Sequence, residues 1–182
     1  MELQYDNDCT NTIVTEPSTN TNTSINKNVS CDSIYDYLNK EEHKQRTMTE
    51  MKPLDKLFPF LIFHVVDNHA VFDYRYIKHN LNETNYPTIL DHCIFVFSNI
   101  LTNFPQIILH LCLKRMTVLD LEKNYKLLSH FCNTMKTRFP NKLKICYIYK
   151  PPFIFSQIIK LLSPFIDKET QAKMVLYQKD AK

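Results

Sequence analysis

The sequence predicts an α/β fold with a mostly parallel sheet of about four to five strands. Two stretches, Gln106–Leu113 and Leu143–Tyr149, are nearly continuous runs of apolar residues, which is typical of strands buried on both faces. The stretch between them, Val118–Arg138, has apolar residues at three- and four-residue spacing and is predicted to be a long amphipathic helix. Helical crossovers of this kind favour parallel pairing and right-handed connections.

The first part of the chain differs in composition from the rest. Residues 1–32 are mostly Asn, Thr and Ser, and a segment of this kind is predicted to be a disordered tail because it cannot bury enough apolar surface. Residues 33–52 are predicted to be a weak helix or linker, with Ser33 as N-cap, that either docks on the domain or stays free. The remaining residues, 53–182, are long enough for one domain with its own core.

The first half of that domain contains a predicted strand, a turn and a helix. Leu57–Val66 is almost entirely apolar and is predicted to be a strand buried on both faces, with Pro59 near its start. Residues 67–69 form a predicted turn, and residues 71–81 are ambiguous, with room for a short helix. Thr88–Leu101 has helical spacing of its apolar residues, and its first residue is the predicted cap.

The end of the chain contains a short helix that is apolar on almost every side. This helix, Phe153–Leu162, follows two consecutive prolines and is terminated by Pro164. A helical turn over residues 167–173 and a last strand, Met174–Tyr177, complete the pattern. A helix that is apolar all round is either buried or faces an apolar partner, and periodicity alone favours burial in the core.

Composition excludes several classes of enzyme. The chain has no glycine, so it lacks the glycine-rich phosphate loops, the nucleophile elbow and the dinucleotide-binding fingerprint. It has neither an H-E-x-x-H motif nor paired cysteine ligands, so we expect no metal site. We predict a protein that is not an enzyme and needs no cofactor. The net charge of +3 and the absence of a base-stacking motif argue against nucleic acid as a partner.

The six cysteines suggest a cytoplasmic location. None of them forms a C-x-x-C pair, and three lie in apolar runs, where a free thiol behaves as a small hydrophobic group. We therefore expect reduced thiols and an intracellular protein. The N-terminus has no signal-peptide pattern, and no apolar run reaches the roughly 20 residues that span a bilayer.

The order of several short motifs in the last third of the chain resembles that of a known family. A long helix ends in an aromatic–proline pair and is followed by a basic strand, a proline-rich turn, a second helix ending in proline, and a lysine before the last strand. The segments are Phe139-Pro140, Lys142–Tyr149, Pro152-Phe153, Leu162–Asp167 and Lys173–Leu176. This pattern resembles the CRAL-TRIO family of Sec-fourteen-like lipid-binding proteins. The resemblance covers Ile107–Tyr177, and Leu57–Leu101 fits the front half of that fold in pattern.

The resemblance implies a sheet beneath a hydrophobic pocket, with Phe153–Leu162 as a gate helix that admits a phospholipid or another lipophilic ligand. The implied gate residues are Phe153, Phe155, Ile158, Ile159, Leu162, Phe165 and Ile166. Lys173 matches a lysine that contacts an inositol phosphate headgroup. Asn141 stands where members that bind phosphatidylinositol have glutamate, so selectivity for that lipid does not follow. The expected pocket wall is Phe95, Phe97, Ile108, His110 and Cys112, although His110 also fits a hydrogen-bonded histidine of the core.

These observations predict a non-enzymatic protein that binds, transfers or senses a lipophilic ligand at a membrane surface. From residue 142 onward the chain has eight lysines and three acidic residues, which suits either an anionic membrane or an ordinary solvated face. The alternative is a protein-interaction scaffold of the same fold with a collapsed pocket, binding a small GTPase or a membrane-traffic partner. The volume of the interior distinguishes the two.

Overall fold

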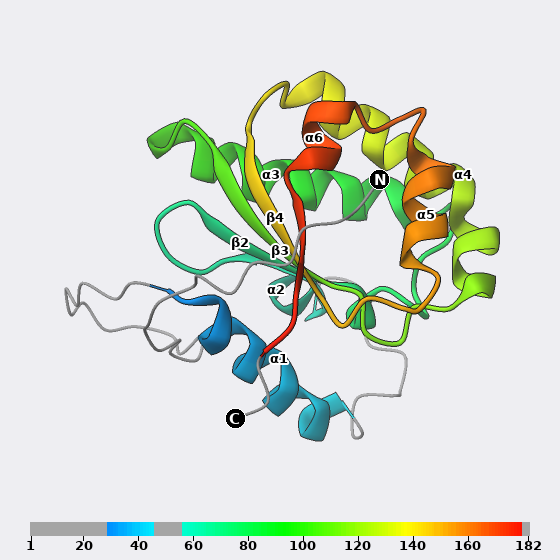
Figure 1. The fold of residues 1–182 in the computed structure, drawn as a ribbon, viewed down its shortest axis with the longest axis horizontal. Coiled ribbons are helices and arrows are strands. Elements are labelled where there is room, and N and C mark those ends of the chain that lie inside the picture. The colour runs from blue at the N-terminus through cyan, green and yellow to red at the C-terminus, as the bar shows by residue number, and fades with distance from the viewer. Residues whose placement is uncertain (1–28, 46–55, 180–182) are drawn as a thin grey trace.

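The computed structural model describes residues 29–45 and 56–179, and in residues 41–45 it describes the backbone alone. The predicted tail, residues 1–32, lies mostly outside the described residues, whereas most of the predicted weak helix or linker, residues 33–52, is described and is helical as far as residue 45. The described residues form one sheet with helices on both of its faces (Figure 1).

The sheet has five strands in the order β1-β2-β3-β4-β5. Strand β1 is antiparallel to β2, and every other neighbouring pair is parallel. This arrangement confirms the predicted α/β class with a mostly parallel sheet. The strands are Ile62–His64 (β1), His69–Asp73 (β2), Ile107–Cys112 (β3), Leu143–Tyr149 (β4) and Met174–Tyr177 (β5).

The helices divide between the two faces of the sheet. One face is covered by α3 (Tyr86–Asn103), α4 (Val118–Arg138), α5 (Phe155–Leu162) and α6 (Lys168–Ala172), whereas α1 (Cys31–Gln45) covers the opposite face (Figure 1). Each face has its own cluster of buried apolar residues, the smaller one beneath α1.

The bounds of α4 agree with the prediction because the sequence marks both ends. Thr117 and Asp120 form a capping box, in which the Thr117 side chain accepts from the Asp120 amide at 3.3 Å and the Asp120 carboxylate accepts from the Thr117 amide at 2.8 Å. The helix ends before Phe139-Pro140, and the next residue, Asn141, has a φ of 58°. Asparagine tolerates this left-handed conformation better than most residues, which gives Asn141 a role in the backbone turn.

The prediction of one long buried strand over Leu57–Val66 is wrong in part. Its first half is a short helix, α2 (Phe58–Leu61), and Pro59 lies in the first turn, where its missing amide and fixed φ are favourable. The second half is β1, which is three residues long and lies at the sheet edge. The ambiguous residues 71–81 contain most of β2, followed by a single 3₁₀ turn, η2 (Tyr74–Tyr76).

Two predicted helix caps are also wrong. The first helix begins at Cys31, and the Ser30 hydroxyl accepts from the Ser33 amide at 3.1 Å, so Ser30 is the capping residue. Helix α3 begins at Tyr86, with Pro87 in its first turn, so Thr88 lies inside the helix.

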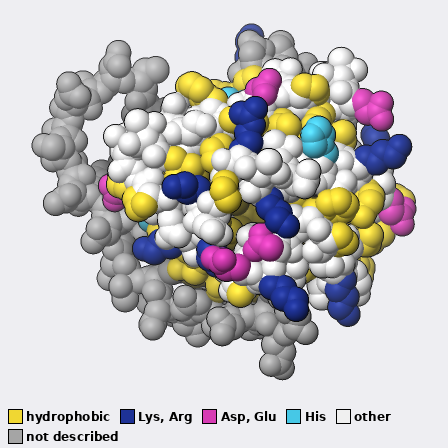
Figure 2. Space-filling view, turned by 90° about the horizontal axis from the view of Figure 1, so that it is seen from above, with side chains coloured by type: hydrophobic (Ala, Val, Ile, Leu, Met, Phe, Trp, Pro, Cys, Tyr) yellow, Lys and Arg dark blue, Asp and Glu magenta, His cyan; other side chains and the backbone are white. Residues whose placement is uncertain are grey.

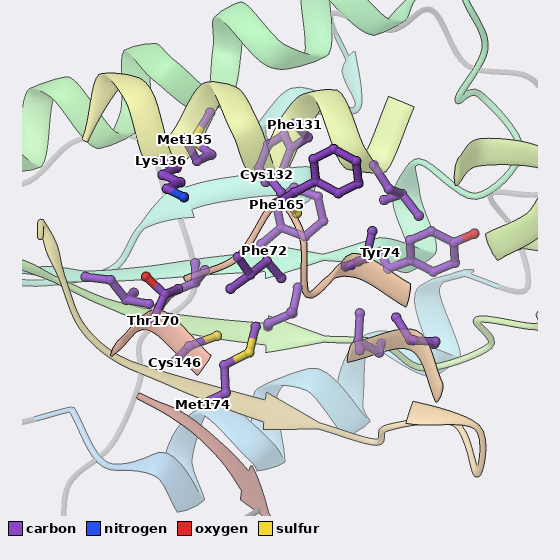
Figure 3. Close-up of a pocket in the computed structure, with 18 of the residues that line it drawn as sticks. Phe72, Tyr74, Phe131, Cys132, Met135, Lys136, Cys146, Phe165, Thr170 and Met174 are labelled. Carbon is purple, nitrogen blue, oxygen red and sulfur yellow. The ribbon is translucent and has the colours of Figure 1, made fainter. Parts of the chain in front are cut away.

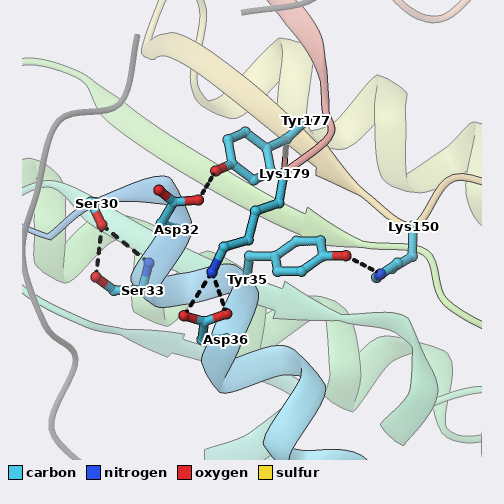
Figure 4. A network of polar contacts seen from close by, with 8 residues as sticks. All are labelled: Ser30, Asp32, Ser33, Tyr35, Asp36, Lys150, Tyr177 and Lys179. Carbon is cyan, nitrogen blue, oxygen red and sulfur yellow. Dashed lines mark hydrogen bonds and ion pairs between the residues drawn. The ribbon is translucent and has the colours of Figure 1, made fainter. Parts of the chain in front are cut away.

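Helix α1 docks on the sheet through both apolar and polar contacts. Ile34 and Leu38 are buried in the smaller core cluster. Three polar pairs join the helix to the C-terminal ends of the last two strands and the residues that follow them (Figure 4). The pairs are Asp32 with Tyr177, Tyr35 with Lys150, and Asp36 with Lys179, the last at 2.8 and 3.0 Å.

Among the described residues, one cysteine differs from the prediction. Cys31, the first residue of α1, is disulfide-bonded, so the expectation that all thiols are reduced is wrong for this residue. The free thiols among the described residues are Cys93, Cys112, Cys132 and Cys146.

Replacing Ile34 with alanine tests whether α1 is part of the folded domain. Ile34 is 1% exposed, so we expect Ile34→Ala to lower the free energy of unfolding by about 2–5 kcal/mol, as measured by urea denaturation. Asp36→Asn, which removes a half-exposed ion pair on the same helix, should change it by less than about 1 kcal/mol. Equal, small effects of both substitutions would show that α1 does not contribute to the core.

Candidate functional site

Strand β3 presents alternate residues to two different interiors. Ile107, Leu109 and Leu111 point toward α3 and α4, whereas His110 and Cys112 point toward α1. This alternation follows from the pleat of a strand, in which successive side chains point to opposite faces. Both faces of β3 are therefore buried, and only one of them borders the cavity described next.

An apolar cavity of about 270 Å³ lies between the sheet and the helices on the larger side. Leu109 and Leu111 of β3 and Cys146 of β4 line it from the sheet. Helix α4 lines the opposite side, where Phe131 and Met135 project toward the strands (Figure 3). Nearly all lining side chains are apolar. The cavity can therefore hold an apolar molecule, but it has few polar groups that could form hydrogen bonds to water.

Helix α5 closes one side of this cavity with a single face. Phe155, Ile158, Ile159 and Leu162 are buried and line the cavity, as do Phe165 and Ile166 just after the helix. The intervening residues of α5 are exposed, so the helix is amphipathic rather than apolar on almost every side. Phe153 lies before the helix and is 92% exposed, so it does not line the cavity.

The two ends of the cavity differ in polarity. Lys136 and Thr170 lie toward one end, and Tyr74 lies at the other (Figure 3). Lys142 and Asp167 also line the cavity, and Lys142, like Lys136, is exposed to solvent. The cavity therefore reaches the surface at the end where α4 finishes and α6 begins, and its mouth carries charged groups.

Asp167 at this mouth is already satisfied by the chain. Its carboxylate accepts from the Thr170 amide at 2.8 Å and from the Thr170 hydroxyl at 3.1 Å, which caps α6. The hydrogen bond from the Thr170 amide is the main reason that the pKa of Asp167 lies below its usual value, and Lys136 adds to the effect. The two lysines at the mouth are thus the groups that can attract an anionic ligand.

The predicted headgroup residue, Lys173, lies elsewhere. Its ammonium group pairs with Glu169 at 2.7 Å, and it does not line the cavity. Sequence reasoning missed Lys136 and Lys142. Helical phase could have suggested Lys136, since it lies four residues after Cys132 on the cavity side of α4.

The predicted pocket wall is mostly misplaced. Phe97 lines the cavity, but Phe95 is 61% exposed on the outer side of α3. Ile108, His110 and Cys112 do not line it, because the prediction chose the wrong set of alternate residues on β3. A shift of one residue moves every side chain of a strand to the other face.

His110 is instead a hydrogen-bonded histidine of the core beneath α1. Its Nε2 lies 2.9 Å from His69 Nδ1, and its Nδ1 lies 2.8 Å from the Tyr149 hydroxyl. Burial holds the pKa of His110 well below its usual value, and burial also lowers the pKa of His69. His110 is therefore neutral in the folded protein, and its hydrogen bonds agree with the alternative of a hydrogen-bonded core histidine.

The described residues contain no group of three or more histidine, cysteine, aspartate or glutamate side chains placed to hold a metal ion. Among the helices of residues 29–45 and 56–179, none combines the length and the apolar character needed to cross a membrane.

The lowered pKa of His110 predicts a pH dependence of stability. The folded protein favours the neutral form of His110. The contribution of His110 to stability is therefore complete above its unfolded pKa of about 6.5 and is lost as the pH falls below that value. We expect the free energy of unfolding to decrease between about pH 7.5 and about pH 5, and His110→Gln to reduce this dependence. His79→Gln, at an exposed site, should leave it unchanged. Identical pH profiles for His110→Gln and the wild type would contradict this assignment.

Comparisons with known proteins identify a domain family and a similar fold. The model of the CRAL/TRIO domain family matches residues 66–182. The crystal structure of Sfh5 superimposes with a TM-score of 0.57 at 14% sequence identity, over 71% of this chain and 50% of that chain. At this identity the likeness shows the fold alone, and the present chain matches about half the length of that protein. No curated protein matches the sequence closely enough to be counted as a relative.

Proposed function

Since the chain belongs to the CRAL/TRIO domain family, we propose that it binds one lipophilic molecule in the cavity and carries or senses it at a membrane surface, without chemical catalysis. The observation that carries this proposal is the cavity itself, about 270 Å³ of space with almost entirely apolar walls inside a domain of this family. The alternative is a protein-interaction scaffold of the same fold with a collapsed pocket, and we favour it less because the interior contains this cavity.

The size of the cavity favours a small or single-chain ligand. Ligand pockets commonly measure about 300–1,000 Å³, so a volume of about 270 Å³ lies just below this range. Each buried methylene contributes about 0.8 kcal/mol, so about ten methylenes contribute about 8 kcal/mol before the cost of immobilising the ligand. A lipid with two acyl chains would require the cavity walls to move apart, whereas a lipid with a single chain needs less volume.

The gate remains a proposal that the geometry supports in detail. The segment from Lys150 to Phe153 joins β4 to α5, contains two consecutive prolines and begins at a residue with a φ of 51°. Because proline fixes φ, we place the hinge at Lys150 and Phe153, which flank the two prolines. The apolar inner face of α5 is its main contact with the rest of the domain. The exposed side chains of Phe153 and Leu161 would meet a membrane when the helix swings outward.

We assign the polar head of the ligand to the mouth of the cavity. Lys136 and Lys142 place two ammonium groups there, and lysine suits carboxylate or phosphate as a point charge. On the side of the molecule seen in Figure 2, apolar surface lies among Lys and Arg side chains and some Asp and Glu side chains. The lysines of such a face can contact an anionic membrane. Lys173 would have to leave Glu169 to take part.

A substitution that fills the cavity should remove ligand binding. Met135 lines the cavity from α4, so we expect Met135→Trp to reduce the affinity for a fluorescent long-chain fatty acid at least about tenfold, measured by titration. Phe95→Trp, on the exposed side of α3, is the matched control and should bind like the wild type. Unchanged binding by a folded Met135→Trp protein would place the ligand outside this cavity.

Neutralising the two lysines at the mouth should affect charged ligands alone. We expect Lys136→Gln combined with Lys142→Gln to weaken binding of a fatty acid anion about threefold to fivefold, because both groups are exposed and partly screened. Binding of the uncharged alcohol with the same chain should not change. Lys173→Gln is the control. If it weakens binding of the fatty acid anion more than the double substitution does, Lys173 is the residue that contacts the headgroup.

A further inference from the structure

Tyr35 of α1 contacts the segment from which the proposed gate begins. Helix α1 lies on the face of the sheet opposite α5, yet the Lys150 ammonium group donates a hydrogen bond to the Tyr35 hydroxyl (Figure 4). The same ammonium group lies 4.2 Å from the centroid of the Tyr35 ring, which is a cation–π contact. The hydrogen bond is also the main reason that the pKa of Tyr35 lies below its usual value. One side chain of α1 therefore holds Lys150 in two ways.

The residue before Lys150 is held by the same ring. Tyr149 is the last residue of β4 and is fully buried. The centroid of its ring lies 6.5 Å from that of Tyr35 and 5.1 Å from that of Tyr177. The Tyr149 carbonyl also accepts a hydrogen bond from the Leu113 amide at 3.0 Å. Tyr149 is thus a fixed point, and the segment that can move starts after it.

The backbone after Tyr149 is poorly suited to hold its own position. Lys150 has a φ of 51°, a conformation that is unfavourable for a residue with a Cβ atom. The two prolines that follow have no amide to donate, and the hydrogen bond from the Phe155 amide to the Pro152 carbonyl, at 2.9 Å, is local. Strained conformations persist where surrounding contacts impose them, and Tyr35 supplies such contacts to Lys150.

Tyr35 can hold Lys150 because α1 is itself anchored elsewhere. The apolar side of α1 is buried in the smaller core cluster. The Asp36 carboxylate pairs with the Lys179 ammonium group at 2.8 and 3.0 Å, next to the end of β5 (Figure 4). Neither of these contacts involves the segment before α5, so α1 can keep its place when that segment moves.

We propose that Tyr35 is a positioning residue for the gate, whose contact with Lys150 keeps the hinge before α5 in its closed conformation and so limits the rate at which a ligand enters and leaves the cavity. This inference rests on the proposed lipid binding and assigns control of exchange to a residue that does not line the cavity. Because the contact is present with and without a ligand, it slows entry and exit by the same factor and leaves the dissociation constant unchanged.

Stopped-flow kinetics of the full chain with a fluorescent long-chain fatty acid test the proposal. Tyr35→Phe keeps the ring but removes the hydroxyl acceptor, so the association and dissociation rates should both rise about threefold. Lys150→Met removes the ammonium group and with it both contacts, so both rates should rise about tenfold. The double variant should be no faster than Lys150→Met, because the two substitutions break the same contact.

Tyr37→Phe is the matched control. Tyr37 lies on the same helix, but its ring contacts that of Phe63 in β1, at the other edge of the sheet from β5. This variant should exchange the fatty acid at the rate of the wild type. If Tyr35→Phe and Lys150→Met lower the melting temperature and leave both rate constants unchanged, the contact only stabilises the fold and the proposal is overturned.

Amide hydrogen exchange of the ligand-free protein separates this inference from the proposed function. Tyr35→Phe and Lys150→Met should increase the exchange of α5 and leave that of α3 unchanged. If the wild type does not bind the fatty acid, the proposed function fails, and amide exchange alone decides whether Tyr35 holds the hinge. If the fatty acid binds and neither its rates nor the amide exchange of α5 differs in the variants, lipid binding stands and the role of Tyr35 is refuted.

Discussion

The alternation of side chains along β3 is the constraint on which the rest of the structure depends. Because the central strand is buried on both faces, each of its residues belongs to one of two interiors. Leu109 and Leu111 face the cavity, and His110 and Cys112 face the core beneath α1. The first set leaves space that the protein does not fill, while the second set is packed and hydrogen-bonded. The cavity and the packed core beneath α1 thus lie on opposite faces of the same strand.

Helix α1 stabilises the packed side and is connected to the ends of the elements that surround the cavity. Tyr35 contacts Lys150, the residue that precedes the two prolines before α5. Asp32 contacts Tyr177, the last residue of β5. These contacts fix the positions from which the proposed gate begins and at which the sheet ends, so that movement can be confined to α5 and its hinge.

Local signals in the sequence predicted the second half of the fold well. The bounds of α4 and β4 agree with prediction because a capping box, an aromatic–proline pair and two consecutive prolines mark their ends, and the bounds of β5 agree as well. The face of β3 that borders the cavity could not be predicted, because apolar residues on both faces hide the alternation. The role of Leu57–Val66 was also misjudged, since a run of ten apolar and aromatic residues fits a strand as well as a short helix followed by an edge strand. Lys136 and Lys142 approach the cavity from different elements, and one sequence does not show which elements meet.

The central claim is that the space beneath α4 and α5 holds a lipophilic molecule. Native mass spectrometry of the protein purified from cells, followed by solvent extraction and analysis of the released lipid, tests it most directly. We predict a bound species at one molecule per chain whose mass fits a single-chain lipid, lost when Met135→Trp fills the cavity. A protein that shows only its bare mass, and that stays bare after incubation with lipid vesicles and with free fatty acids, would contradict the account.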